Sequence, residues 1–287
     1  MKYQFIAAQR RCHRVTRLCA VLGVTRSGYY AWRRRPASRR AQEDQRLLGE
    51  IRKIHTAHRE NYGAEKTWHE LRERGEACGR HRVARLRREA GIEAKRMRRF
   101  RRQRAYTKTL PPAPNRLQQR FVASRPNVVW VADTTFIPTC RGAVHLAIVL
   151  DLYARRVVGW SMRSRNDLTL TLGALEMAIT QRRPGPGLIH HSDQGGPYVA
   201  ARYLSLLRQH GFHPSMSRTG NCYDNAVAES FFSNLKNEAT CHQLFPNRDA
   251  ARAAIFDYIE VFYNRQRRHQ TLGYQSPAQF EQMTGVA

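Results

Sequence analysis

The sequence predicts an α/β domain with a mixed sheet, preceded by all-α, helix-turn-helix-like modules. Three observations lead to this fold class. The first 122 of the 287 residues carry 33 Lys and Arg against ten Asp and Glu, whereas the remainder carries 17 against twelve. A proline-rich segment, Leu110 to Asn115, marks this change in composition and resists helix formation. Beyond it, β-branched and apolar runs alternate with helical patterns, which is typical of layered α/β domains.

The basic front contains two helical units. Residues 1–40 show apolar positions at helical spacing, a turn at Gly23 and a second helix that ends in Arg33, Arg34 and Arg35. This pattern favours a helix-turn-helix that contacts DNA, and a helical hairpin with a solvated basic end is the alternative.

The second unit, residues 45–105, consists of several helices separated by glycines. It ends in a dense basic run made of Lys95, Arg96, Arg98, Arg99, Arg101, Arg102 and Arg104. Such runs are usually solvated faces or arms. In this context we expect the arm to follow DNA.

The second half of the chain begins after a linker at 106–122. Strands are expected at 128–137, 144–152 and 157–161, and their short connections predict an antiparallel meander. A helix capped by Asp167 follows, and then strand, helix, strand and helix alternate up to residue 240. We therefore expect one α/β domain over 123–240 and a helical, basic extension over 241–287, whose last helix begins at Ser276-Pro277.

The charge identifies the class of partner. The formal charge is +28, and 44 of the 50 basic residues are Arg, whose planar guanidinium suits phosphate. No window approaches ~20 apolar residues, so no membrane partner is expected. The start of the chain does not read as a secretory signal, and the six cysteines form no C-x-x-C pair. We expect a protein of the reducing cytoplasm, associated with the nucleoid.

Three carboxylates in the second half are candidates for chemistry. Asp133 lies within an apolar strand, Asp193 ends another strand, and Glu229 lies on a helix over 224–236 that Asp224 is expected to cap. Three clustered carboxylates repel one another, and hard divalent cations with oxygen ligands neutralise them. Two such ions would activate an attacking oxygen and stabilise a leaving oxygen in phosphoryl transfer.

The helix that carries Glu229 is amphipathic. Val227, Phe231 and Leu235 are expected on its buried face, while Asn225, Glu229 and Lys236 share a polar stripe on the other side. A solvated surface face is the ordinary explanation of that stripe. Together with Asp133 and Asp193, however, it favours a catalytic face, on which Asn225 orients Glu229 or contacts DNA.

Four strings in the sequence match a known family. They are W-V-A-D-T-T at 130–135, H-S-D-Q-G at 191–195, the segment from Gly220 to Glu238, and the tail from Tyr263 to Phe280. These strings resemble the integrase-core transposases of bacterial insertion elements, and most of all the second-frame (OrfB) proteins of the IS-three family. The resemblance covers essentially the whole chain.

The resemblance implies a ribonuclease H-like catalytic domain that nicks DNA and transfers the freed 3′-hydroxyl. It implies Asp133, Asp193 and Glu229 as ligands of two Mg²⁺ ions, with Mn²⁺ as an alternative, and Lys236 as a contact to element-end DNA. It further implies a first-frame companion (OrfA) or a fusion with it, and a homo-oligomer assembled on terminal repeats and target DNA.

Two further groups have weaker assignments. His190 and His191 flank the second aspartate, and we expect a structural role for them, not metal ligation. Arg265, Arg267 and Arg268 form a late basic cluster that is expected to contact phosphate or to be solvated. Two rival functions remain open: a non-catalytic DNA-binding regulator and a metal-dependent nuclease of the same fold.

Overall fold

The computed structural model describes residues 1–36, 38–95, 113–218 and 222–285. Its contacts divide the chain into two compact units, Met1–Lys53 and Ile54–Ala287. One continuous helix, α4 (Arg39–Ala57), covers the boundary expected between residues 40 and 45. No helix in the described ranges is both long and apolar enough to cross a bilayer.

The first unit is a small helical cluster built from α1 (Lys2–Gln9), α2 (Val15–Leu22), α3 (Arg26–Arg34) and the start of α4. Gly23 ends α2 at φ +61°, a left-handed conformation that glycine adopts without strain. Thr25 then starts α3 by accepting a hydrogen bond from the backbone N–H of Gly28 at 3.1 Å. The predicted pair of helices around a glycine turn is therefore confirmed. Its small core consists of Ile6, Leu18, Cys19 and Tyr29.

The second unit begins with a helical part that contains α5 (Ala64–Glu73) and α6 (Arg80–Glu89). Arg87 is buried here, and its guanidinium donates to Thr67 Oγ1 and to the carbonyl of Tyr62, which satisfies its buried donors. Lys95 is the last described residue of the basic run. The expected DNA contacts of Arg96, Arg98, Arg99, Arg101 and Arg102 lie outside the described residues.

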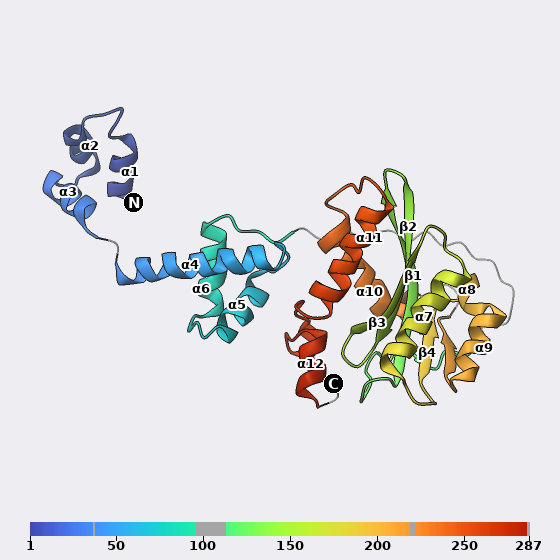
Figure 1. The fold of residues 1–287 in the computed structure, drawn as a ribbon. Coiled ribbons are helices and arrows are strands. Elements are labelled where there is room, and N and C mark those ends of the chain that lie inside the picture. The colour runs from blue at the N-terminus through green and yellow to red at the C-terminus, as the bar shows by residue number, and fades with distance from the viewer. Residues whose placement is uncertain (37, 96–112, 219–221, 286–287) are drawn as a thin grey trace. The chain divides into compact units, whose positions relative to one another are not determined.

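A mixed five-stranded sheet forms the centre of the second unit (Figure 1). Its strands are β1 (Val129–Thr139), β2 (Gly142–Asp151), β3 (Arg156–Arg163), β4 (Ile189–Ser192) and β5 (His213–Met216). Their spatial order is β3-β2-β1-β4-β5, with β1, β2 and β3 antiparallel and with β4 and β5 parallel to β1. The expected meander and mixed sheet are confirmed, and this topology is ribonuclease H-like.

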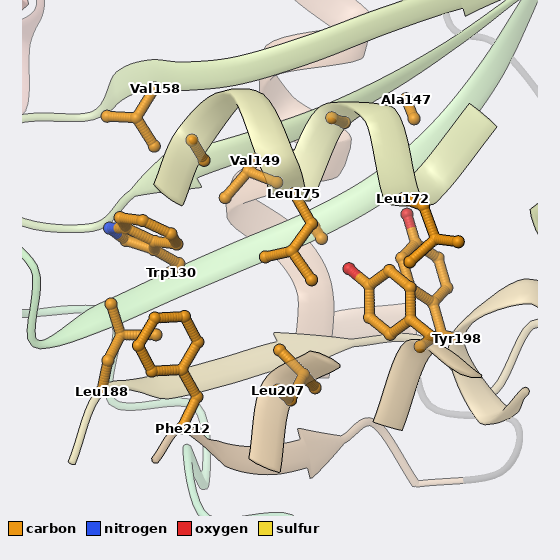
Figure 2. Close-up of a cluster of buried hydrophobic side chains, with 14 of the residues drawn as sticks. Trp130, Ala147, Val149, Val158, Leu172, Leu175, Leu188, Tyr198, Leu207 and Phe212 are labelled. Carbon is orange, nitrogen blue, oxygen red and sulfur yellow. The ribbon is translucent and has the colours of Figure 1, made fainter. Parts of the chain in front are cut away.

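One face of the sheet is covered by α7 (Leu168–Arg182), which Asp167 caps as predicted by accepting from Leu170 N–H at 3.0 Å. The short helix α8 (Gly196–Val199) and α9 (Ala201–Gln209) complete this layer. Figure 2 shows their side chains packed with those of β1 and β2. At Gly159 of β3, a Cβ atom would lie 2.2 Å from the carbonyl oxygen of Ala174, so α7 approaches the strand closely.

The opposite face is covered by the helices that follow β5. They are η1 (Cys222–Asn225), α10 (Ala226–Leu235), the π-helical η2 (Lys236–Thr240), α11 (Arg248–Phe256) and the π-helical η3 (Asp257–Tyr263). Figure 1 shows α10 and α11 on the side of the sheet away from α7. The chain ends with η4 (Gln270–Leu272) and α12 (Pro277–Met283), which starts in the predicted way with a capping box at Ser276.

Candidate active site

Asp133 and Asp193 occupy matching places on neighbouring strands. In the parallel pair β1–β4, Val131 lies opposite His191, and each aspartate follows its paired residue by two positions. Because neighbouring strands lie about 4.8 Å apart, Asp133, within β1, lies beside the point where Asp193 follows the end of β4. Asp133 is only 1% exposed, whereas Asp193 is half-buried.

Backbone N–H groups fix both carboxylates. Asp133 Oδ1 accepts from the N–H of Thr134 at 2.8 Å, and Asp193 Oδ1 accepts from the N–H of Gly195 at 3.0 Å. The turn after Asp193 is tight, because a Cβ on Gly195 would lie 2.9 Å from that same carboxylate oxygen. The glycine therefore lets the backbone approach the aspartate closely.

Helix α10 runs alongside β1. At its start, the Asn225 side chain donates to the carbonyl of Ala132 at 3.3 Å. Just past its end, Lys236 Nζ lies 5.9 Å from the ring centroid of Phe136. The earlier residue of the helix contacts the earlier residue of β1, and the later residue contacts the later one. The helix and the strand therefore run in the same direction.

This path places Glu229 near the two aspartates. Glu229 follows Asn225 by four residues, an axial rise of ~6 Å, which corresponds to about two residues of an extended strand. Its backbone therefore lies at about the level of Asp133 and Thr134. Its side chain is half-buried.

The buried face of α10 differs from the prediction. Val227 is only half-buried, while Ala228 and Phe232 are buried together with Phe231 and Leu235. Asn225, expected on the outer stripe, is 2% exposed. The helix packs on nearly all sides, so its polar stripe is not a solvated surface face.

Asp224 does not cap α10, contrary to the prediction. Its carboxylate accepts from the backbone N–H of Arg218 at 2.9 Å and from the Arg218 guanidinium at 3.1 Å. It also accepts from the amides of Asn115 and Gln119, both at 2.9 Å. The hydrogen bonds from Arg218 hold the pKa of this carboxyl well below its ordinary value. Asp224 thus links the segment before β1, which contains Asn115 and Gln119, to Arg218 in the segment before α10. Sequence reasoning missed this role, because an aspartate at the start of a helix reads as a cap.

His190 and His191 have the expected structural role. The two ring nitrogens of His191 pair with Ser215 Oγ at 2.8 Å and Ser217 Oγ at 3.2 Å. His190 Nε2 pairs with the hydroxyl of Tyr203 at 3.0 Å. Burial lowers the pKa of His190 to about 3 and that of His191 to about 4. Both rings are therefore neutral supports for β4.

The chemistry of the three carboxylates fits a hard divalent cation. Carboxylate oxygens are the ligands that Mg²⁺ and Mn²⁺ prefer, and a buried Asp133 benefits from nearby positive charge. Within the described parts of the chain, no three His, Cys, Asp or Glu side chains lie close enough to hold one ion together. Asp133 and Asp193 thus lie on neighbouring strands with Glu229 on the adjacent helix, and binding one ion requires the three carboxylates to converge further.

Two predicted phosphate contacts need correction. Arg267, 8% exposed, is paired with Glu238 at 2.7 Å, and that carboxylate also accepts from the hydroxyl of Tyr258. Arg268, 4% exposed, is paired with Glu70 at 2.6 Å and with Glu73. A buried guanidinium needs a partner carboxylate, and both of these groups have one inside the protein. They are therefore not free to contact phosphate.

The other described DNA-contact candidates are more accessible. Arg265 is exposed, as are Arg33, Arg34 and Arg35 at the end of α3. Lys95 is half-buried, and its backbone N–H donates to the carbonyl of Glu60.

Three segments of the chain match known families. Residues 123–222 match the family described as "Integrase core domain", and residues 229–284 match a second family with the same description. Residues 42–100 match the "HTH-like domain" family, so this match lies on the second helical module and not on residues 1–40.

Curated relatives match over nearly the full length. The "Insertion element IS600 uncharacterized 31 kDa protein" of Shigella sonnei is 48% identical over 92% of this chain and 97% of its own length. "Transposase InsF for insertion sequence IS3A" of Escherichia coli (strain K12) is 41% identical over 98% of both chains.

Solved structures give more distant similarity. The HTLV-2 integrase catalytic core domain in complex with magnesium (trimeric form) is 17% identical, with a TM-score of 0.42 over 54% of this chain and 96% of its own. A chain of the simian T-cell lymphotropic virus intasome in complex with PP2A regulatory subunit B56 gamma is 13% identical, with a TM-score of 0.41 over 80% of this chain and 73% of its own. The identity to full-length relatives and the integrase-core matches together show that the chain belongs to the IS3-family transposases, which are DNA transposases of the DDE polynucleotidyl transferase class.

Proposed function

We propose that this transposase binds the ends of its own element, nicks the DNA there and joins the freed 3′-hydroxyl to a second phosphodiester. The observation that carries the proposal is the place of Asp133 on β1 beside the end of β4, which Asp193 follows, with Glu229 on the helix that runs alongside. Carboxylates on three adjacent elements suit metal-dependent phosphoryl transfer.

Asp133, Asp193 and Glu229 are the proposed ligands of two Mg²⁺ ions, with Mn²⁺ as a substitute. When bound, such ions activate the attacking oxygen and stabilise the leaving 3′-oxygen. The attacking group is water for nicking and the 3′-hydroxyl for joining, so the proposal assigns no Ser or Tyr nucleophile.

The remaining residues of the site position the carboxylates and the DNA. Asn225, tied to the carbonyl of Ala132, holds the start of α10 against β1 and so sets the level of Glu229. His191 and its two serines hold β4 in place beside Asp193. Lys236, seven residues after Glu229, is the proposed contact to a phosphate of the element end.

The helical modules are proposed to hold DNA through phosphate contacts. The candidates are Arg33, Arg34, Arg35, Lys95 and Arg265, together with the five arginines of the basic run outside the described residues. Trp32 and Arg10 join Arg33 and Arg35 around an open pocket of about 520 Å³ in the first unit. Guanidinium groups beside an aromatic ring suit nucleic-acid binding.

Assembly belongs to the same proposal. Joining an element end to target DNA involves several DNA segments, so we propose a homo-oligomer on the terminal repeats and the target. We also propose that a first-frame companion, or a fusion with it, contributes to recognition of the ends.

The proposal is tested with labelled element-end DNA, target DNA and Mg²⁺, using the chain together with its first-frame partner. Glu229→Gln removes one carboxylate charge at nearly constant volume, and Glu176→Gln, at an exposed position on α7, is the matched control. We expect joined products from the wild type and the control, and none from Glu229→Gln. Equal joining by all three proteins would contradict the assigned site. Cleavage without joining by the wild type would favour a nuclease.

A further inference from the structure

A row of side chains with DNA-binding chemistry crosses the sheet beside the candidate active site. In the antiparallel register, Phe136 of β1 lies opposite His145 of β2, which lies opposite Arg163 of β3. The three residues therefore share one face of the sheet. The Phe136 and His145 ring centroids lie 6.4 Å apart.

This row lies outside the buried core of that face. Ala147 and Val149 of β2, which continue the same face, are buried under α7. Phe136 is 52% exposed, Arg163 is exposed and His145 is half-buried. Packing in the core therefore does not account for the phenyl ring at this position.

Lys236 connects the row to the active site. Its Nζ lies 5.9 Å from the centre of the Phe136 ring, although α10 packs on the other face of the sheet. β4 pairs with β1 only from Val129 to Val131, so β4 does not cover the edge of β1 beside Phe136. Asp133 and Phe136 lie three residues apart on β1, about 10 Å along an extended strand, and their side chains leave opposite faces of the sheet. A DNA strand at Asp133 would therefore have to pass the edge of β1 to bring a base to Phe136.

We propose that Phe136 is a stacking platform for one nucleobase that leaves the duplex next to the reacting phosphodiester. His145 supports the ring from the neighbouring strand, and Lys236 and Arg163 flank it with positive charge for the phosphates of the same strand. An exposed aromatic ring between cations is the arrangement with which proteins bind unpaired bases. The inference rests on the proposed function, since it assumes that DNA is bound at Asp133.

The base can come from the element end or from target DNA, and two probes distinguish these sources. One DNA carries 2-aminopurine beside the cleavage site of the element end, and the other carries it in the target duplex. Both are measured with the Asp133→Asn protein and its first-frame partner, so that no chemistry occurs during the titration. The DNA that rises in emission on binding is the source of the unstacked base.

Three substitutions in that background test the ring. Phe136→Leu keeps an apolar side chain and removes the platform, whereas Phe136→Tyr keeps the platform. Phe256→Leu is the matched control, because Phe256, at the end of α11, is 49% exposed and contacts Trp160 of β3, outside this row.

We expect the emission rise with the parent, Phe136→Tyr and Phe256→Leu, and its loss with Phe136→Leu. Affinity for the DNA that carries the unstacked base should fall between about fivefold and about 150-fold in Phe136→Leu, the range for one stacked base. Thermal melting and circular dichroism check that Phe136→Leu is folded.

Equal emission and equal affinity in a folded Phe136→Leu protein would overturn the platform. Strand joining by Phe136→Leu in the otherwise wild-type protein separates the platform hypothesis from the proposed function. Normal joining without any emission change would contradict the platform and leave the proposed function in place. An emission change that depends on Phe136, in a protein whose wild type joins no DNA, would remove the proposed function instead.

Discussion

Asp224 and Arg218 form a closed hydrogen-bonded pair at the entrance to α10. The backbone N–H and the guanidinium of Arg218 both donate to this carboxylate, which is itself inaccessible to solvent. Asn115 and Gln119 bind the same two oxygens from the other side. The pair therefore fixes where α10 begins, and with it the level at which Glu229 meets the strands.

Loss of this carboxylate should weaken the domain and misplace Glu229. Asp224→Ala removes the acceptor for four donor groups. The exposed side chains of Arg218 and Gln119 can bind water instead, and a donor that stays buried without a partner costs about 1–3 kcal/mol. We expect a fall of that order in the free energy of unfolding, measured in urea, and a rise in the Mg²⁺ concentration needed for half-maximal joining. Asp249→Ala, at a carboxylate that is 85% exposed, is the control. Unchanged stability and Mg²⁺ dependence would show that Asp224 has no such role.

The buried histidines predict a pH dependence of stability. Because burial lowers the pKa of His190 to about 3 and that of His191 to about 4, the unfolded chain binds their protons first as the pH falls below about 6.5. The free energy of unfolding should therefore decrease from pH 6.5 to pH 4. Each histidine adds a slope of up to about 1.4 kcal/mol per pH unit. His190→Gln keeps an acceptor for Tyr203 and should give a shallower slope in urea titrations. A slope identical to that of the wild type would contradict the neutral, buried state of His190.

Arg268 should matter for stability because its charge is paired inside the protein. Arg268→Gln removes a buried guanidinium from Glu70, which keeps Arg74, and from the half-exposed Glu73, so the loss should approach but not exceed the about 3–5 kcal/mol of a broken buried pair. Arg74→Gln loses an exposed bond to the same Glu70 and should cost less than about 1 kcal/mol. Urea unfolding of the two variants tests this difference. Equal, small losses would return Arg268 to the class of solvated or phosphate-binding arginines.

The close approach of α7 to β3 makes Gly159 sensitive to a single methyl group. A Cβ there would lie 2.2 Å from the Ala174 carbonyl oxygen and 2.7 Å from Ala178 Cβ, so Gly159→Ala should destabilise the domain by about 1–3 kcal/mol. Gly185→Ala, where a Cβ meets nothing within 4 Å, is the matched control. Thermal unfolding separates the two variants, and equal melting temperatures would contradict the packing of α7 on the strand.

Local patterns were enough to predict the elements that carry the site. Apolar runs located the strands, and Asp167 and Ser276 marked helix starts because capping depends on residues three positions apart. The strand and helix patterns also assigned Asp133, Asp193 and Glu229 to their elements, and that these carboxylates form one site remains a prediction.

Partners that are distant in the sequence could not be predicted in this way. Arg267 and Arg268 look in the sequence like Arg265, and only the fold brings Glu238, Glu70 and Glu73 to the first two. Asp224 looked like a cap for the same reason, since Asn115 lies 109 residues away. The sequence showed Phe136 only as a strand residue. It gives no sign of which residues on that face of the sheet α7 leaves exposed.

We propose that Asp133, Asp193 and Glu229 bind the metal ions required for DNA joining. Replacing the oxygen ligand of Asp193 by sulfur tests this assignment. Asp193→Cys replaces an oxygen ligand by sulfur, which Mg²⁺ accepts poorly and Mn²⁺ accepts better. The measurement is the rate of strand joining in Mg²⁺ and in Mn²⁺, with Asp249→Cys as the exposed control. We expect Asp193→Cys to lose joining in Mg²⁺ and to recover it in Mn²⁺, while the control joins in both. An equal loss in both ions from a folded protein, or no loss in either, would contradict the assignment of Asp193 as a metal ligand.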